Sequence, residues 1–160
     1  MKRMTAVCAL GLMILVGAGH RSTLPVVYHS ERYGLTFRLP ESWRGYSVRV
    51  KHWREDASED DRGQRLHGSI IVFRHPGWKA SDPYHDIPIL VFRRRDWMAK
   101  QGDFNLYAGG VFFELTHNAK YVFATHSRFN LDYETKGADE VGKIVAANRE
   151  ASRTPWLINE

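Results

Sequence analysis

The chain has almost no cysteine. Cys8 is the only one among 160 residues, and it lies close to the N-terminus. If the N-terminal segment is removed as a leader, the remaining chain has no disulfide, thiolate metal ligand, iron–sulfur cluster or cysteine nucleophile. Small exported eukaryotic domains usually carry disulfides, so we expect a protein of the bacterial envelope, in the periplasm or outside the cell.

The chain also lacks the local motifs of common catalytic and nucleotide-binding sites. It contains no H-E-x-x-H or His-x-His pair for zinc and no G-x-S-x-G or S-x-x-K for a serine nucleophile. It has neither a phosphate-binding P-loop nor a dinucleotide-binding glycine motif. We therefore expect no cofactor and no bound metal.

Charge of either sign is modest. The chain has 23 basic and 18 acidic residues. Two of the basic residues, Lys2 and Arg3, would leave with the N-terminal segment, and the positive excess would then be small. Such an excess does not predict a nucleic-acid partner.

The N-terminus has the three parts of a secretory signal. Lys2 and Arg3 form a positive start, residues 6–16 form an uncharged apolar run, and residues 16–18 offer a signal-peptidase site. The apolar run is shorter than the roughly 20 residues that span a bilayer. We predict a signal peptide over residues 1–19 and no stable membrane span after its removal. Without cleavage, this segment would tether the protein to the membrane.

The remaining chain is long enough for one domain with its own core. We place this domain at residues 24–152 and a C-terminal tail at 153–160. Hairpin-linked strands with helices between and after them predict an α+β fold, with an antiparallel sheet flanked by a few helices. We find no internal repeat, linker or second domain in the sequence.

Apolar periodicity locates the expected elements. Leu35, Phe37 and Leu39 alternate with polar residues, as in a half-buried strand, and Ser42 is expected to cap a short helical turn. The nearly continuous apolar run at 87–92 predicts a central strand covered on both faces. Two strands are expected within 26–39 around a turn at 31–34, and others at 46–50, 67–73, 111–115 and 121–125. Helices are expected at 94–102 and 137–149, the second with Val141, Ile144 and Val145 on one face.

Several short segments carry a resemblance. They are YGLTFRLPESWRGYS at 33–47, RHPGW at 74–78, DIPI at 86–89, NAKYVFA at 118–124 and RFN at 128–130. Together they resemble a family of small exported bacterial proteins without an assigned function, which supplies no catalytic residues. The order of elements is also similar, more distantly, to the fold of the photosystem II extrinsic protein and its relatives. Those proteins mostly act as binding or assembly factors, an analogy at the level of the fold.

The stretch RHPGWKASDPYHDIP, residues 74–88, concentrates chemically active side chains. Its three prolines restrict their neighbours to extended conformations, which favours a stiff corner between two strands where Asp86 or His85 bonds loose backbone groups. In the alternative interpretation the loop carries a ligand pocket, because loops on rigid sheets often hold binding residues. The rim of that pocket would consist of Arg74, His75, Trp78, His85 and Asp86.

We expect a non-catalytic binding or accessory module of the envelope, for a protein partner or a small anionic ligand. Arg74 and Arg128 are the expected anion contacts, because a guanidinium presents two donors to a carboxylate or phosphate. The alternative is a small hydrolase or metal-dependent enzyme that uses His75, His85 and Asp86. A third possibility is an exposed sheet edge that recruits a partner by strand addition.

Overall fold

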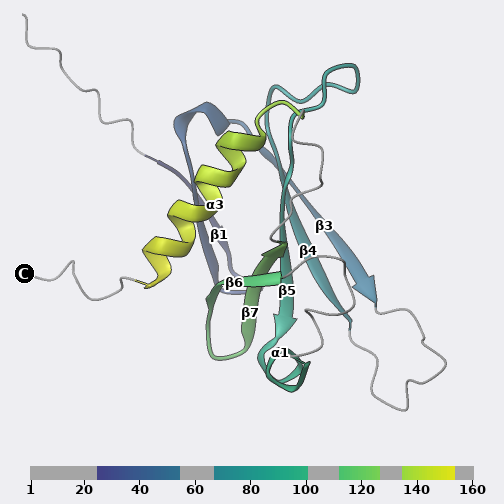
Figure 1. Ribbon diagram of the computed structural model, residues 1–160, viewed down its shortest axis with the longest axis vertical. Helices are drawn as coiled ribbons and strands as arrows, with labels where there is room; N and C mark the ends of the chain where they lie inside the picture. The colour runs from purple at the N-terminus through teal and green to yellow at the C-terminus, as the bar shows by residue number, and fades with distance from the viewer. Residues whose placement is uncertain (1–24, 55–66, 101–111, 127–134, 154–160) are drawn as a thin grey trace, which may run out of the picture.

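The computed structural model describes residues 25–54, 67–100, 112–126 and 135–153. It contains a two-stranded and a five-stranded antiparallel sheet, a short helix and a long C-terminal helix (Figure 1). The predicted α+β class with an antiparallel sheet is therefore confirmed. The predicted signal peptide lies outside the described residues, as does the predicted tail after Arg153.

The smaller sheet is a hairpin of β1 (Val26–Ser30) and β2 (Leu35–Leu39), as predicted. Gly34 closes the turn with a φ of +66°, the left-handed conformation that glycine adopts without a steric penalty. The alternation of apolar and polar residues in β2 also corresponds to a half-buried strand, as predicted. Its apolar side chains are buried and its polar ones exposed, the buried residues being Leu35, Phe37 and Leu39.

The larger sheet has the strand order β3-β4-β5-β7-β6, and every neighbouring pair is antiparallel. β5 lies in its centre, with Ile89 buried on one face and Phe92 on the other, so the predicted central strand is confirmed. β3 forms one margin of the sheet and β6 the other. The strands are β3 (Ser47–Arg54), β4 (His67–Arg74), β5 (Ile87–Arg93), β6 (Phe112–His117) and β7 (Tyr121–His126).

Two α-helices complete the described fold. The first, α1 (Arg94–Lys100), follows β5 directly, and its expected end at Gly102 lies outside the described residues. The second, α3 (Ala138–Arg153), begins after Gly137 and buries the predicted apolar face of Val141, Ile144 and Val145. No helix in the described part of the chain is long and apolar enough to cross a membrane.

The short 3-10 helix η1 (Glu41–Trp43) corrects one expectation. Its N-cap residue is Pro40, which has no side-chain cap, and Ser42 lies inside the helix. The prediction that Ser42 caps this turn is therefore wrong. Its hydroxyl instead donates to the Glu140 carboxylate of α3, an ionised acceptor that forms a strong hydrogen bond.

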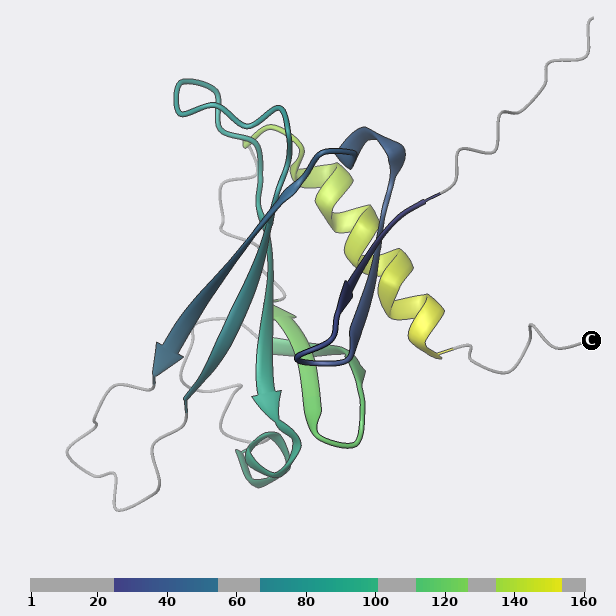
Figure 2. The same cartoon turned by 180° about the vertical axis from the view of Figure 1, so that it is seen from behind.

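The core lies on both faces of the five-stranded sheet. The β1–β2 hairpin and α3 cover one face, which carries the larger apolar cluster (Figures 1 and 2). A smaller cluster with Phe92, Trp97 and Val122 occupies the other face beside α1. α3 thereby contacts both sheets, and its first turn comes close to the loop between β4 and β5 (Figure 1).

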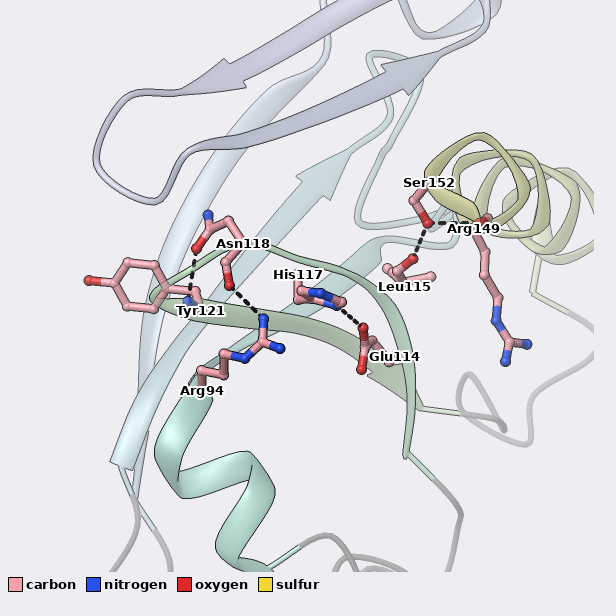
Figure 3. A network of polar contacts seen from close by, with 8 residues as sticks. All are labelled: Arg94, Glu114, Leu115, His117, Asn118, Tyr121, Arg149 and Ser152. Atoms are coloured by element: carbon pink, nitrogen blue, oxygen red, sulfur yellow. Dashed lines mark hydrogen bonds and ion pairs between the residues drawn. The ribbon is translucent and has the colours of Figure 1, made fainter. Parts of the chain in front are cut away.

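The β6–β7 hairpin is bonded to both helices (Figure 3). Arg94 of α1 donates to the carbonyl oxygen of Asn118 at 3.2 Å, and Ser152 of α3 donates to the carbonyl oxygen of Leu115 at 2.6 Å. The Asn118 side-chain oxygen accepts the backbone N–H of Tyr121 at 2.9 Å and closes the turn. The bond from Ser152 holds the C-terminal half of α3 against β6.

Candidate functional site

Arg74 ends β4 and Asp86 precedes β5, so the pairing of these strands brings the two side chains together. They form a two-pronged ion pair, with Nε 3.0 Å from Oδ1 and Nη2 2.6 Å from Oδ2. The guanidinium lies over the Trp78 ring, 3.9 Å from its centroid. The hydrogen bond to Asp86 also raises the pKa of Arg74. The positive charge that would bind an anionic ligand is therefore paired within the protein.

His75 is held by aromatic rings. Its ring stacks on Tyr84 with 3.9 Å between centroids and meets the Trp43 ring edge-on at 5.1 Å. The backbone N–H of Gly77 donates to Nδ1 at 3.0 Å, which requires an unprotonated Nδ1 and places the proton of the neutral ring on Nε2. Nε2 is buried and has no hydrogen-bond partner among the described residues.

His85 is buried, and two hydrogen bonds join it to the backbone of other residues. Its Nδ1 lies 2.9 Å from the carbonyl oxygen of Asp86, and its backbone N–H donates to the carbonyl oxygen of Lys136 at 2.8 Å. Lys136 also forms an ion pair with Asp82 at 2.6 Å and a parallel bridge with Tyr84. The loop between β4 and β5 is thus fastened to the segment that leads into α3.

This fastening brings Tyr84 to the first turn of α3, where side chains converge on a carboxylate. Ser42 donates to Oε1 of Glu140 at 2.6 Å, and the Tyr84 hydroxyl donates to Oε2. The Trp43 and His75 rings pack against Tyr84. We term this group the Glu140 cluster: Ser42, Trp43, His75, Tyr84 and Glu140.

The cluster stabilises the negative charge of Glu140. Burial acts to raise the pKa of this carboxyl, but hydrogen bonds from Ser42 and Tyr84 outweigh it and leave the pKa below its ordinary value of 4.5. The indole of Trp43 acts in the same direction, although no hydrogen bond of regular geometry from its Nε1 is found among the described residues. Burial, and then the bond to Glu140, raise the pKa of Tyr84 to about 12. At neutral pH the cluster therefore pairs a carboxylate with protonated donors.

Replacing Glu140 by glutamine is expected to remove a pH-dependent part of the stability. Since the folded pKa of Glu140 is depressed, its ionised form stabilises the fold fully above about pH 4.5 and progressively less as the pH falls through the folded pKa. The difference in urea midpoint between wild type and Glu140→Gln, measured from neutral to strongly acidic pH, should therefore shrink at the acidic end.

The matched control is Asp139→Asn, the same chemical change on the exposed residue beside Glu140 in the first turn of α3. It should show a weaker dependence of the difference on pH, because no side-chain hydrogen bond to Asp139 is found in the described part of the chain. Equal pH dependence in the two variants would contradict the role assigned to the Glu140 cluster.

A groove of about 420 Å³ lies between β2 and α3, next to this cluster. At this groove Asn148 joins α3 to β2. Its side-chain oxygen accepts the backbone N–H of Arg38 and its side-chain nitrogen donates to the carbonyl oxygen of Arg38, both at 2.8 Å. The Asn148 side chain thus bonds the same two backbone groups of Arg38 that a neighbouring antiparallel strand would bond. Figure 2 shows α3 running beside the β1–β2 hairpin. The apolar lining of this β2–α3 groove consists of Pro25, Leu39, Pro40, Ile144 and Ala147.

Two exposed cations also line the β2–α3 groove. Arg38 comes from β2 and Lys143 from α3, and neither side chain has an ion pair within the described ranges of the chain. Glu140 lies at the same groove, but its carboxylate already accepts two hydrogen bonds from the Glu140 cluster. Two cations against this one carboxylate leave the groove with an apolar surface and a net positive charge at its edge.

The residues that were predicted to share one rim make different contacts. Arg74, Trp78 and Asp86 form an internal contact group, whereas His75 belongs to the Glu140 cluster. Of the two residues expected to bond loose backbone groups, His85 does so, but Asp86 bonds the Arg74 side chain. The sixth residue, Arg128, lies outside the described residues.

The contacts give little support to the enzyme alternative. His75, His85 and Asp86 have different hydrogen-bond partners. Over the ranges that the structure describes, no three His, Cys, Asp or Glu side chains are grouped as metal ligands would be. The Ser42 hydroxyl donates to a carboxylate, not to an imidazole, so it lacks the histidine base of a serine nucleophile.

The sequence reasoning did not identify Arg38, Glu140 or Lys143. Glu140 and Lys143 are spaced i, i+3 on α3 and thus share a helix face, which was visible in the sequence. The contacts of Glu140 were not visible in the sequence, because its partners Ser42 and Tyr84 lie 98 and 56 residues away along the chain.

Comparison of the chain with models of protein families, with curated proteins and with solved structures finds no match in any of the three. The function is therefore inferred from the contacts and charges of the molecule itself.

Proposed function

We propose that this protein is an exported, non-catalytic binding module that holds a small amphipathic anion in the β2–α3 groove. The observation that carries the proposal is the combination of an apolar lining with two unpaired cations, Arg38 and Lys143. An apolar ligand body would displace water from the lining, which is favourable, and its anionic head would meet the cations at the edge.

Export rests on the N-terminal sequence and on the resemblance to small exported bacterial proteins. Residues 1–19 combine a positive start, an apolar run and a cleavage pattern. A binding role without catalysis is favoured by the Glu140 cluster, whose hydroxyl donors stabilise a carboxylate and leave no activated nucleophile.

The anion contacts differ from those expected from the sequence. Arg74 is neutralised by Asp86 and covered by Trp78, so a ligand would have to displace an internal ion pair to reach it. Arg38 and Lys143 are exposed and require no such displacement. We therefore assign the anionic head to these two side chains.

Titration of the purified protein with decanoate tests the proposal. Saturable binding is expected by calorimetry, with weaker binding of decanol, which lacks the charge, and of decylamine, which has the opposite charge. Arg38→Gln and Lys143→Gln should each weaken decanoate binding about fivefold, as is typical for an exposed ion pair of about 1 kcal/mol. Arg49→Gln, on the exposed edge strand β3, is the control and should leave the affinity unchanged.

A second variant blocks the groove without changing charge. Ala147 lines the groove and is exposed, so Ala147→Trp should fill it and weaken decanoate binding more than tenfold. Ala146→Trp adds the same side chain at the neighbouring exposed position, which does not line the groove, and should bind normally. Equal binding by both tryptophan variants, or equal affinity for decanoate and decylamine, would overturn the proposal.

A further inference from the structure

The edge strand β3 forms a second surface with features of a binding site, apart from the β2–α3 groove. Its eight residues pair with β4 along their whole length, and its other edge pairs with no strand in the described part of the chain. Figures 1 and 2 show β3 at the margin of the sheet, away from α3. In an antiparallel pair, alternate residues direct their backbone N–H and C=O groups away from the partner. β3 therefore presents a row of backbone donors and acceptors to its surroundings.

Most side chains of β3 are exposed as well, apart from Val48 and Trp53, which are half-buried. Arg49, Lys51 and Arg54 are exposed, and none of them has an ion pair or hydrogen bond among the residues that the structure describes. Val50 is 47% exposed. The strand thus combines an open backbone edge, three unneutralised cations and an uncovered apolar side chain.

These features exclude a second copy of this chain as the strand that pairs with β3. A second copy of β3, paired edge to edge, would place cationic side chains close to cationic side chains, which destabilises the pairing. Natural edge strands use lysine and arginine in this way to prevent self-association. The same charges attract a strand of opposite sign, so the edge discriminates between partners.

The alternation in β3 also defines the pattern of the partner. Arg49 and Lys51 lie on one face of the sheet, and Val48 and Val50 lie on the other. A strand added to this edge continues both faces, so acidic side chains would lie beside the cations and apolar ones beside the valines. The complementary sequence alternates acidic and apolar residues.

We infer that the outer edge of β3 binds an extended acidic–apolar segment of a protein partner by strand addition. Backbone hydrogen bonds supply affinity in this mode, and alternate side chains supply specificity. The surface shares no residue with the lining of the β2–α3 groove, so a protein partner and a small anion would bind at different places.

The probe is a peptide of eight residues that alternates valine and glutamate, the length matching that of β3. Fluorescence anisotropy should show saturable binding that weakens as salt is added. Arg49→Glu combined with Lys51→Glu should weaken binding more than tenfold. Arg38→Glu combined with Lys143→Glu makes the same change of charge at the groove and should leave peptide binding unchanged, while it abolishes decanoate binding.

Two further probes separate strand addition from simple attraction of charge. The same peptide with methylated backbone nitrogens keeps its charge but cannot donate hydrogen bonds, and it should bind more than tenfold more weakly. Equal binding of the methylated peptide would overturn the inference. So would a single-stranded oligonucleotide that binds more tightly than the peptide, or full binding by the Arg49/Lys51 variant. Unchanged thermal unfolding of that variant shows that its fold is intact, and Arg49→Gln combined with Lys51→Gln, which removes the charges without reversing them, should weaken peptide binding in the same direction.

Discussion

Replacing Trp43 by alanine is expected to destabilise the fold by about 3 to 5 kcal/mol, the usual cost of removing a large buried aromatic side chain. Trp43 is 0% exposed, although it lies in a 3-10 helix of only three residues. Its ring meets His75 and Tyr84 edge-on, at 5.1 and 6.1 Å between centroids. Truncation would leave a cavity under η1, within the Glu140 cluster. This cavity cannot collapse, because Ser42 and Tyr84 are held in place by their bonds to Glu140 of α3. Chemical denaturation monitored by far-UV circular dichroism measures this loss.

Trp78 provides the matched control for Trp43. It is half-buried, and its principal contact is with the Arg74 guanidinium, 3.9 Å from the ring centroid. Trp78→Ala is expected to cost about 1 kcal/mol, the magnitude of a partly exposed cation–π contact. If the two alanine variants lose the same stability, Trp43 is not the anchor of this end of the fold.

Gly137→Ala is expected to cost about 3 kcal/mol, although it adds a single methyl group. Gly137 precedes α3 with a φ of +83°, a left-handed conformation that costs an alanine about 1 kcal/mol or more. The added carbon would also overlap the Tyr84 ring, only 2.7 Å from Cδ1 and closer still to two other ring atoms. Overpacking of this kind typically adds a further cost of about 1 to 3 kcal/mol. Tyr84 would have to move, and its bond to Glu140 would be lost.

A double-mutant cycle divides this effect into its parts. In a Tyr84→Ala background the ring is absent, so Gly137→Ala should cost only the backbone strain, about 1 kcal/mol. Gly142→Ala is the control within α3, where an added methyl group meets nothing within 4 Å. It should stabilise the protein by about 0.5 to 1 kcal/mol, because alanine is the better helix former. Full cost of Gly137→Ala without Tyr84 would show that the contact with the ring is irrelevant.

The predictions of buried faces that rested on the periodicity of apolar residues were confirmed. The alternation of Leu35, Phe37 and Leu39 identified both the strand and its buried face, since successive side chains in a strand point to opposite sides. The continuous apolar run of β5 identified the central strand. The helical spacing of Val141 and Ile144 identified the face of α3 that packs on the sheet.

Predictions about which groups a side chain contacts were less accurate. The concentration of functional side chains at 74–88 correctly drew attention to this loop, but most of these side chains satisfy one another. Arg74 pairs with Asp86, twelve residues away, and His75 stacks on Tyr84. Ser42 was assigned to a local cap because its nearest candidates in the sequence are backbone groups. Its actual acceptor, Glu140, was not foreseeable from local pattern.

The sequence by itself determined the fold class, the central strand, the buried faces and the absence of any cysteine beyond Cys8. These properties follow from composition and from periodicity over a few residues, which local geometry converts into strands and helices. Only the tertiary structure decided which polar groups are occupied and which are free. Arg74 is occupied, whereas Arg38, Arg49 and Lys143 have no ion pair among the described residues. The reason is physical: the contacts that distinguish them join residues far apart in the chain, and only the packing of α3 and the two sheets brings such residues together.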